Sequence, residues 1–133
     1  MNNEKTITIC GKEVGLRYCA AAETGYEELS NKSSGVFSPT INKRDKDGNP
    51  IDVTPPKATE KDYILLAVAA IIAYYAKHEE TEPIKSEDIL FDANAQDVTN
   101  LIVTIVQLRN NWYKIPDVIK PEMEESDKQE KNA

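Results

Sequence analysis

The chain has 133 residues, of which 40% are hydrophobic and 29% charged, a size and composition typical of one globular domain. Its formal net charge of -7 repels phosphate and anionic lipid, which argues against nucleic acid or a membrane surface as a partner. The start, MNNEKTITIC, has no apolar stretch behind a basic segment, so no secretory signal is expected and the cytoplasm is the predicted compartment.

A β-hairpin is predicted near the N-terminus, because residues 6–19 alternate with the period of a strand on both sides of Gly11-Lys12. Glycine at the first central position favours a two-residue type II′ turn over Gly11 and Lys12. This turn places four apolar side chains on one face of the hairpin, in two cross-strand pairs. The predicted pairs are Ile9 with Val14 and Ile7 with Leu16.

A short helix is predicted next, over Ala20–Ser30, with three apolar side chains on one face. These are Ala22, Tyr26 and Leu29. Residues 31–58 are rich in glycine and proline and are expected to form a long irregular loop. A second hairpin inside this loop would pair residues 36–41 with residues 51–54.

The strongest feature of the sequence is the unbroken apolar run of residues 63–76. Thr59 and Asp62 resemble a capping box that would start a helix just before it. The run is shorter than the roughly 20 residues that a membrane span requires, and charged residues flank it. A core helix, covered on nearly all sides, is therefore predicted here.

Two more helices are predicted in the C-terminal half. Ser86 is expected to cap a short helix that ends at Phe91, and Asn94 with Asp97 to open a longer helix that ends near Tyr113. The longer helix has an apolar stripe that should face the core. The stripe consists of Val98, Leu101, Ile102, Ile105, Leu108 and Trp112.

The opposite face of this last helix is the candidate protein-binding surface. It holds Val103, Val106 and Gln107 among uncharged polar residues, where a solitary surface helix would carry more charge. Such a face suits an amphipathic client helix. Tyr75 is a further candidate as an aromatic contact, although core packing is the competing interpretation for the Tyr74-Tyr75 pair.

These elements predict an α+β fold, in which an N-terminal β-hairpin packs against a mainly helical bundle of about four helices. Residues 1–116 are expected to form a single domain. Residues 117–133 are acidic and poor in hydrophobic residues, so a disordered acidic tail is predicted there. The sequence does not distinguish a solubilising role of this tail from an interaction with a basic partner.

Motifs for catalysis and metal binding are missing from the sequence. His78 is the only histidine, so a catalytic triad or a multi-histidine metal site cannot be built within one chain. Neither a glycine-rich phosphate loop nor a Cys-x-x-Cys pair occurs. His78 ends the predicted core helix, where it is expected to interact with the helix dipole. We therefore expect no enzymatic activity, no cofactor and no bound metal.

The order of these features resembles the phage tail assembly chaperone family. The motifs that carry the resemblance are Ile-Thr-Ile-x-Gly-Lys-Glu-x-x-Leu-Arg over residues 7–17, Tyr-Glu-Glu-Leu over residues 26–29 and Lys-Ser-Glu-Asp-Ile-Leu over residues 85–90. The apolar helix and the closing amphipathic helix complete the pattern, whereas residues 31–58 depart from it. The resemblance implies a chaperone that binds the helical tape measure protein and shields its apolar surface until the tail tube polymerises.

Other functions are compatible with the same features. A structural or tail-completion protein would remain in the phage particle. Association of the protein with copies of itself, as a homo-oligomer, is a further alternative. An acidic inhibitor of a basic or nucleic-acid-binding protein would need its carboxylates on an ordered surface. An enzyme would require carboxylates from several chains to meet in an oligomer.

Overall fold

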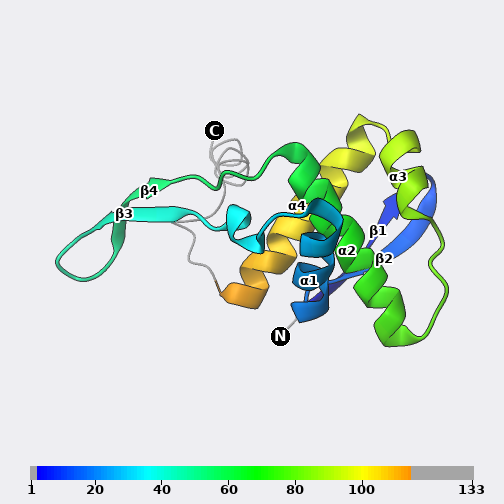
Figure 1. Ribbon diagram of the computed structural model, residues 1–133, viewed down its shortest axis with the longest axis horizontal. Coiled ribbons are helices and arrows are strands. Elements are labelled where there is room, and N and C mark those ends of the chain that lie inside the picture. The colour runs from blue at the N-terminus through cyan, green and yellow to red at the C-terminus, as the bar shows by residue number, and fades with distance from the viewer. Residues whose placement is uncertain (1–2, 115–133) are drawn as a thin grey trace, which may run out of the picture.

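The computed structural model describes residues 3–114 (Figure 1). Its architecture is α+β, with an N-terminal antiparallel hairpin and four α-helices, which confirms the predicted fold class. In chain order the elements are β1 (Glu4–Ile9), β2 (Lys12–Arg17), α1 (Ala20–Ser30), the 3-10 helix η1 (Ser34–Phe37), β3 (Thr40–Arg44), β4 (Pro50–Thr54), α2 (Glu60–His78), α3 (Ser86–Asp92) and α4 (Ala95–Tyr113). The predicted acidic tail, residues 117–133, lies outside the described residues.

The turn between β1 and β2 differs from the prediction. It is formed by Cys10 and Gly11, whose φ angles of 52° and 75° are both in the left-handed region, as a type I′ turn requires. The register therefore pairs Ile7 with Val14 and Ile9 with Lys12. The sequence correctly located the turn at Gly11. It was expected at the first central position of the turn, however, and it occupies the second, after Cys10. Because each partner moves by two residues, the apolar side chains still share one face.

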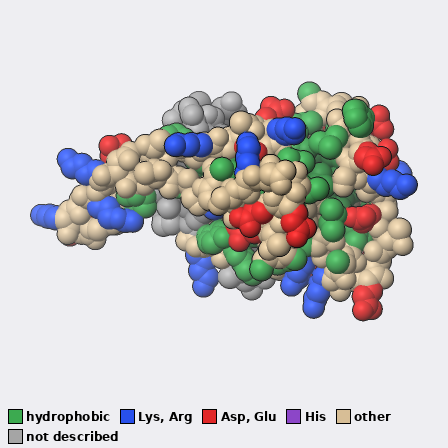
Figure 2. All heavy atoms as spheres, in the orientation of Figure 1, with side chains coloured by type: hydrophobic (Ala, Val, Ile, Leu, Met, Phe, Trp, Pro, Cys, Tyr) green, Lys and Arg blue, Asp and Glu red, His purple; other side chains and the backbone are tan. Residues whose placement is uncertain are grey.

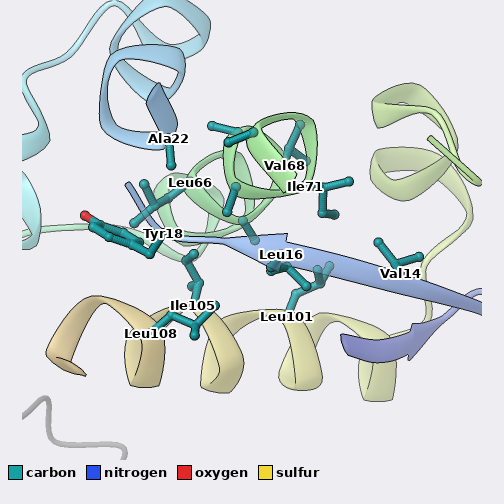
Figure 3. Close-up of a cluster of buried hydrophobic side chains, with 14 of the residues drawn as sticks. Val14, Leu16, Tyr18, Ala22, Leu66, Val68, Ile71, Leu101, Ile105 and Leu108 are labelled. Atoms are coloured by element: carbon teal, nitrogen blue, oxygen red, sulfur yellow. The ribbon is translucent and has the colours of Figure 1, made fainter. Parts of the chain in front are cut away.

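The first hairpin lies between two helices, with β2 packed against α2 and β1 against α4 (Figure 3). Val14 and Leu16 are fully buried in the same cluster as Leu101 of α4. Gly15, between them, faces the other way and allows close packing of α2. A Cβ atom there would lie 2.5 Å from the Tyr74 ring, so any side chain at this position would displace it.

The apolar run forms the central helix α2, as predicted, and α1, β2 and α4 all pack against it. Its start is fixed by the predicted capping box, in which the Thr59 hydroxyl accepts a hydrogen bond from the Asp62 backbone N–H. Helix α1 is also confirmed, and Tyr26 is fully buried against α2. Leu29 departs from the prediction, since the last turn of α1 is not covered and the side chain is 47% exposed.

The second hairpin, β3–β4, projects from the body of the protein as an arm (Figure 1). Its first strand begins at Thr40, later than predicted, because residues 34–37 instead form η1. Phe37 ends η1 and is buried between two aromatic rings, with ring centroids 4.8 Å from Tyr26 and 5.1 Å from Tyr63. Burial of Phe37 thus holds the base of the arm to the core.

The last two helices agree with the sequence except at one cap. Asn94 and Asp97 form the predicted capping box of α4. Ser86 is the first residue of α3 and not its cap, because Lys85 holds the N-cap position and no side chain caps this helix. None of the helices within residues 3–114 is both long enough and apolar enough to cross a membrane.

Candidate protein-binding surfaces

The four residues predicted to bind a partner do not form one surface. Tyr75 is in the core, and its hydroxyl oxygen accepts a hydrogen bond of 3.0 Å from the backbone N–H of Gly15. It thereby connects α2 to β2 and satisfies a buried donor. Val106 is only 3% exposed, since α4 is buried around more of its circumference than the apolar stripe predicts, and Thr104 is buried with it. Neither Tyr75 nor Val106 is available to a partner in this conformation.

Val103 and Gln107 do lie together, in an open groove between β1 and α4. Both side chains are half-buried and line a cavity of about 450 Å³ with residues of β1 that include Lys5 and Ile7. The Lys5 Nζ donates a hydrogen bond of 3.0 Å to Gln107 Oε1. The groove is therefore mixed in polarity, with one apolar contact from each element and a lysine at its rim.

A more apolar surface, which the sequence analysis missed, lies on α2 and α3. Phe91 is 85% exposed, Leu90 49% and Ile72 42%, and hydrophobic side chains gather over these helices in Figure 2. We call Ile72, Leu90 and Phe91 the α2–α3 surface. A run of three apolar residues in a seven-residue helix was the available signal, because their side chains point in directions about 100° apart and only Ile89 is buried.

The position of α3 is set by two buried anchors and one hydrogen bond. Ile84 and Ile89 are both buried in the core cluster, and Lys12 Nζ donates to the carbonyl oxygen of Pro83 at 3.0 Å. Since successive helix residues are about 100° apart, burying Ile89 turns Leu90 and Phe91 away from the core. The exposure of the α2–α3 surface is thus a consequence of how α3 is anchored.

Acidic side chains lie on the same helix as two residues of this surface. Helix α3 carries Glu87, Asp88 and Asp92 beside its apolar residues. Their field extends to the tip of the first hairpin, where burial first, and then the charges of Asp97, Asp92 and Asp88, raise the pKa of the Cys10 thiol. An apolar patch with an acidic rim is suited to a partner with apolar and basic side chains.

The single histidine, His78, takes part in an ion-pair network. His78 Nε2 and Arg17 Nη1 each lie 2.8 Å from Glu4 Oε2. Burial opposes ionisation of Glu4, but the hydrogen bonds to Arg17 and His78 and their charges hold its pKa below the ordinary value. His78 thus has a partner that the helix-dipole prediction did not foresee. No group of His, Cys, Asp and Glu residues within 3–114 is arranged to hold a metal ion.

These geometries support recognition of another molecule through side-chain contacts, on the α2–α3 surface or in the β1–α4 groove. No protein-family model, no curated protein and no solved structure matches this chain. A functional proposal therefore rests on the residues and contacts described above.

Proposed function

We propose that this protein is an assembly chaperone that binds an amphipathic helix of a client protein, in the manner implied by its resemblance to phage tail assembly chaperones. The observation that carries the proposal is the α2–α3 surface, where Phe91 is 85% exposed beside the half-exposed Leu90. An aromatic side chain left in water beside other apolar groups is typical of interaction sites. The client in this proposal is a long helical protein of the tape measure type.

The chemistry of the surface favours one kind of client segment. Its apolar centre matches the apolar face of a helix, and the acidic rim formed by Glu87, Asp88 and Asp92 matches basic residues that flank such a face. Full burial of Phe91 or Leu90 would contribute roughly 1.5–3 kcal/mol each before the cost of association is subtracted. Binding would therefore be reversible, as a chaperone that must release its client requires.

The order of elements gives further support. The N-terminal hairpin, the short helix, the long apolar helix and the closing amphipathic helix occur in the order on which the resemblance was based. The motif over residues 85–90 lies at the start of α3 and includes Leu90 of the α2–α3 surface. In this proposal the protein acts in the host cytoplasm, binds its client without catalysis and leaves before the particle is complete.

The proposal is tested by co-expression with the longest coiled-coil-rich protein encoded beside it. We expect the two proteins to co-purify and the client to be soluble only in company. Changing Phe91→Glu should reduce the recovered client about tenfold or more, because it places a charge in the apolar contact. Ile51→Glu is the matched control, since Ile51 is 55% exposed but lies on the β3–β4 arm.

Three outcomes of this test are informative. Loss of client with Phe91→Glu and normal recovery with Ile51→Glu would support the α2–α3 surface. If a third variant, Val103→Glu, is the only one that loses the client, the chaperone function stands and the client binds in the β1–α4 groove. A client that is equally soluble alone and never co-purifies would refute the chaperone function, and the protein should then be sought in finished particles by mass spectrometry.

A further inference from the structure

A second feature of the surface is a cavity whose wall contains a buried arginine. The cavity has a volume of about 340 Å³ and lies where the C-terminal end of α4 meets η1 and the start of β3. Arg109 of α4 lines it and is only 8% exposed, while Ser34, Ser38 and Ile41 contribute to the opposite side. None of these residues belongs to the α2–α3 surface.

The guanidinium of Arg109 is held in place by a hydroxyl group and an aromatic ring. Its Nη2 donates a hydrogen bond of 3.0 Å to Ser38 Oγ, and its Cζ lies 4.7 Å from the centre of the Tyr113 ring. Its Nε is buried and has no hydrogen-bond partner among residues 3–114. Within residues 3–114 no carboxylate forms an ion pair with it. A charge buried to this extent is ordinarily paired with an anionic group.

The acidic residue that lines the cavity, Glu23, has other hydrogen-bond partners. Its Oε2 accepts a hydrogen bond of 2.7 Å from the Tyr18 hydroxyl and another from the Tyr113 hydroxyl. Burial, followed by the hydrogen bond to Glu23 and its negative charge, raises the pKa of Tyr113 to about 12, so this phenol remains a donor at neutral pH. Tyr113 therefore contacts both charged groups and keeps Glu23 occupied.

We infer that this cavity binds a peptide carboxylate, which forms an ion pair with the Arg109 guanidinium. The planar guanidinium presents several N–H donors to a carboxylate, and the Tyr113 ring and Ser38 hold it in a fixed orientation. The hydroxyl of Ser34, which also lines the cavity, is an additional donor. Glutamate or aspartate side chains can come from two sources: a partner protein or residues 117–133 of this chain, whose acidic residues follow Tyr113 closely in the sequence.

The test uses nuclear magnetic resonance of the full-length chain, with the arginine Nε–H signal of Arg109 as the readout. The probe is the blocked tripeptide acetyl-Ala-Glu-Ala-amide, and acetyl-Ala-Gln-Ala-amide is its uncharged match. We expect a saturable shift with the glutamate peptide and none with the glutamine peptide. Glu23→Gln keeps an oxygen acceptor for both tyrosine hydroxyls but removes a repelling charge, so it should tighten binding on the order of fivefold.

A second full-length variant separates the two sources. In it the acidic residues of segment 117–133 are changed to their amides. If the wild-type protein already binds the glutamate peptide, a carboxylate in trans has access to the site. If the Arg109 signal moves when the segment is neutralised, and the peptide binds only then, the chain's own segment occupies the cavity.

The inference is overturned if the Arg109 signal responds to the glutamate peptide in neither protein, or responds equally to the glutamine peptide. The test requires no substitution of Arg109, because replacing this buried residue would also affect folding. It also does not involve a client, so failure here would leave the chaperone proposal standing, and failure of the chaperone proposal would leave the carboxylate site standing.

Discussion

The two hairpins of this protein have similar turn residues, but one is buried in the core and the other is exposed to solvent. β1–β2 lies between α2 and α4, and its residues Ile9, Val14 and Leu16 are fully buried. β3–β4 extends away from the body (Figure 1). Ile51, near the start of β4, is 55% exposed. Both hairpins have a glycine with positive φ in the turn. Local turn chemistry therefore makes a hairpin but does not decide whether it becomes core.

The two hairpins also differ in what holds them together. The loop of the arm is organised by Asp45, whose Oδ1 accepts hydrogen bonds of 2.9 Å from the backbone N–H groups of Asp47 and Asn49. The first hairpin instead depends on the side chains packed on both of its sides. An isolated two-stranded hairpin is only marginally stable in water. Substitutions should accordingly have large effects in β1–β2 and small effects in β3–β4.

The largest effect is expected from truncation in the buried hairpin. Leu16→Ala should lower the free energy of unfolding by about 3 kcal/mol, because it removes a fully buried side chain and leaves a cavity. Ile51→Ala, on the arm, should change it by less than about 0.5 kcal/mol. Urea denaturation of both variants measures the difference. Similar losses in the two variants would show that the arm is packed as tightly as the core.

An intermediate effect is expected at the point where the chain returns from the arm to the core. Burial would raise the pKa of Asp62, but hydrogen bonds from the Thr59 backbone, Lys32, Tyr26 and the Thr59 hydroxyl outweigh it and lower the value from 3.8 to about 2. The native state thus favours the ionised form, and this stabilisation is present above about pH 5 and lost as the pH falls towards 2. It should contribute about 2 kcal/mol.

The variant Asp62→Asn isolates this contribution from other titrating groups. At pH 7 it should be less stable than the wild type by about 2 kcal/mol, and the difference should shrink as the pH approaches 2. Urea denaturation at several pH values measures it. A difference that stays constant with pH would show that the charge of Asp62 is not what stabilises this junction.

The smallest of these effects is expected from a single hydroxyl group. Tyr75→Phe leaves the ring in place but deprives the Gly15 backbone N–H of its acceptor, so stability should fall by about 1.5 kcal/mol. Client recovery in the co-expression test should not change, since Tyr75 is buried. If the Tyr75→Phe protein is stable but does not recover the client, Tyr75 contacts the client after all.

Much of the fold was predictable because it depends on neighbours in the sequence. The capping boxes at Thr59 and Asn94, the apolar run of α2 and the stripe of α4 all reflect spacings of three or four residues. The candidate site was less predictable. Helical periodicity placed Val106 outside the core stripe, whereas packing around α4 buries it. The exposure of Phe91 depends on which of three adjacent apolar residues fits the core.

The sequence by itself determined the type and approximate extent of the helices and the presence of both hairpins, because hydrogen bonds within a helix or a turn join residues close in the chain. Only the tertiary structure decided the burial of Tyr75 and the burial of Arg109. Each of these depends on distant residues: Tyr75 meets Gly15 and Arg109 meets Ser38 through contacts that join separate elements. Such contacts arise from the packing of whole elements, which no local pattern specifies.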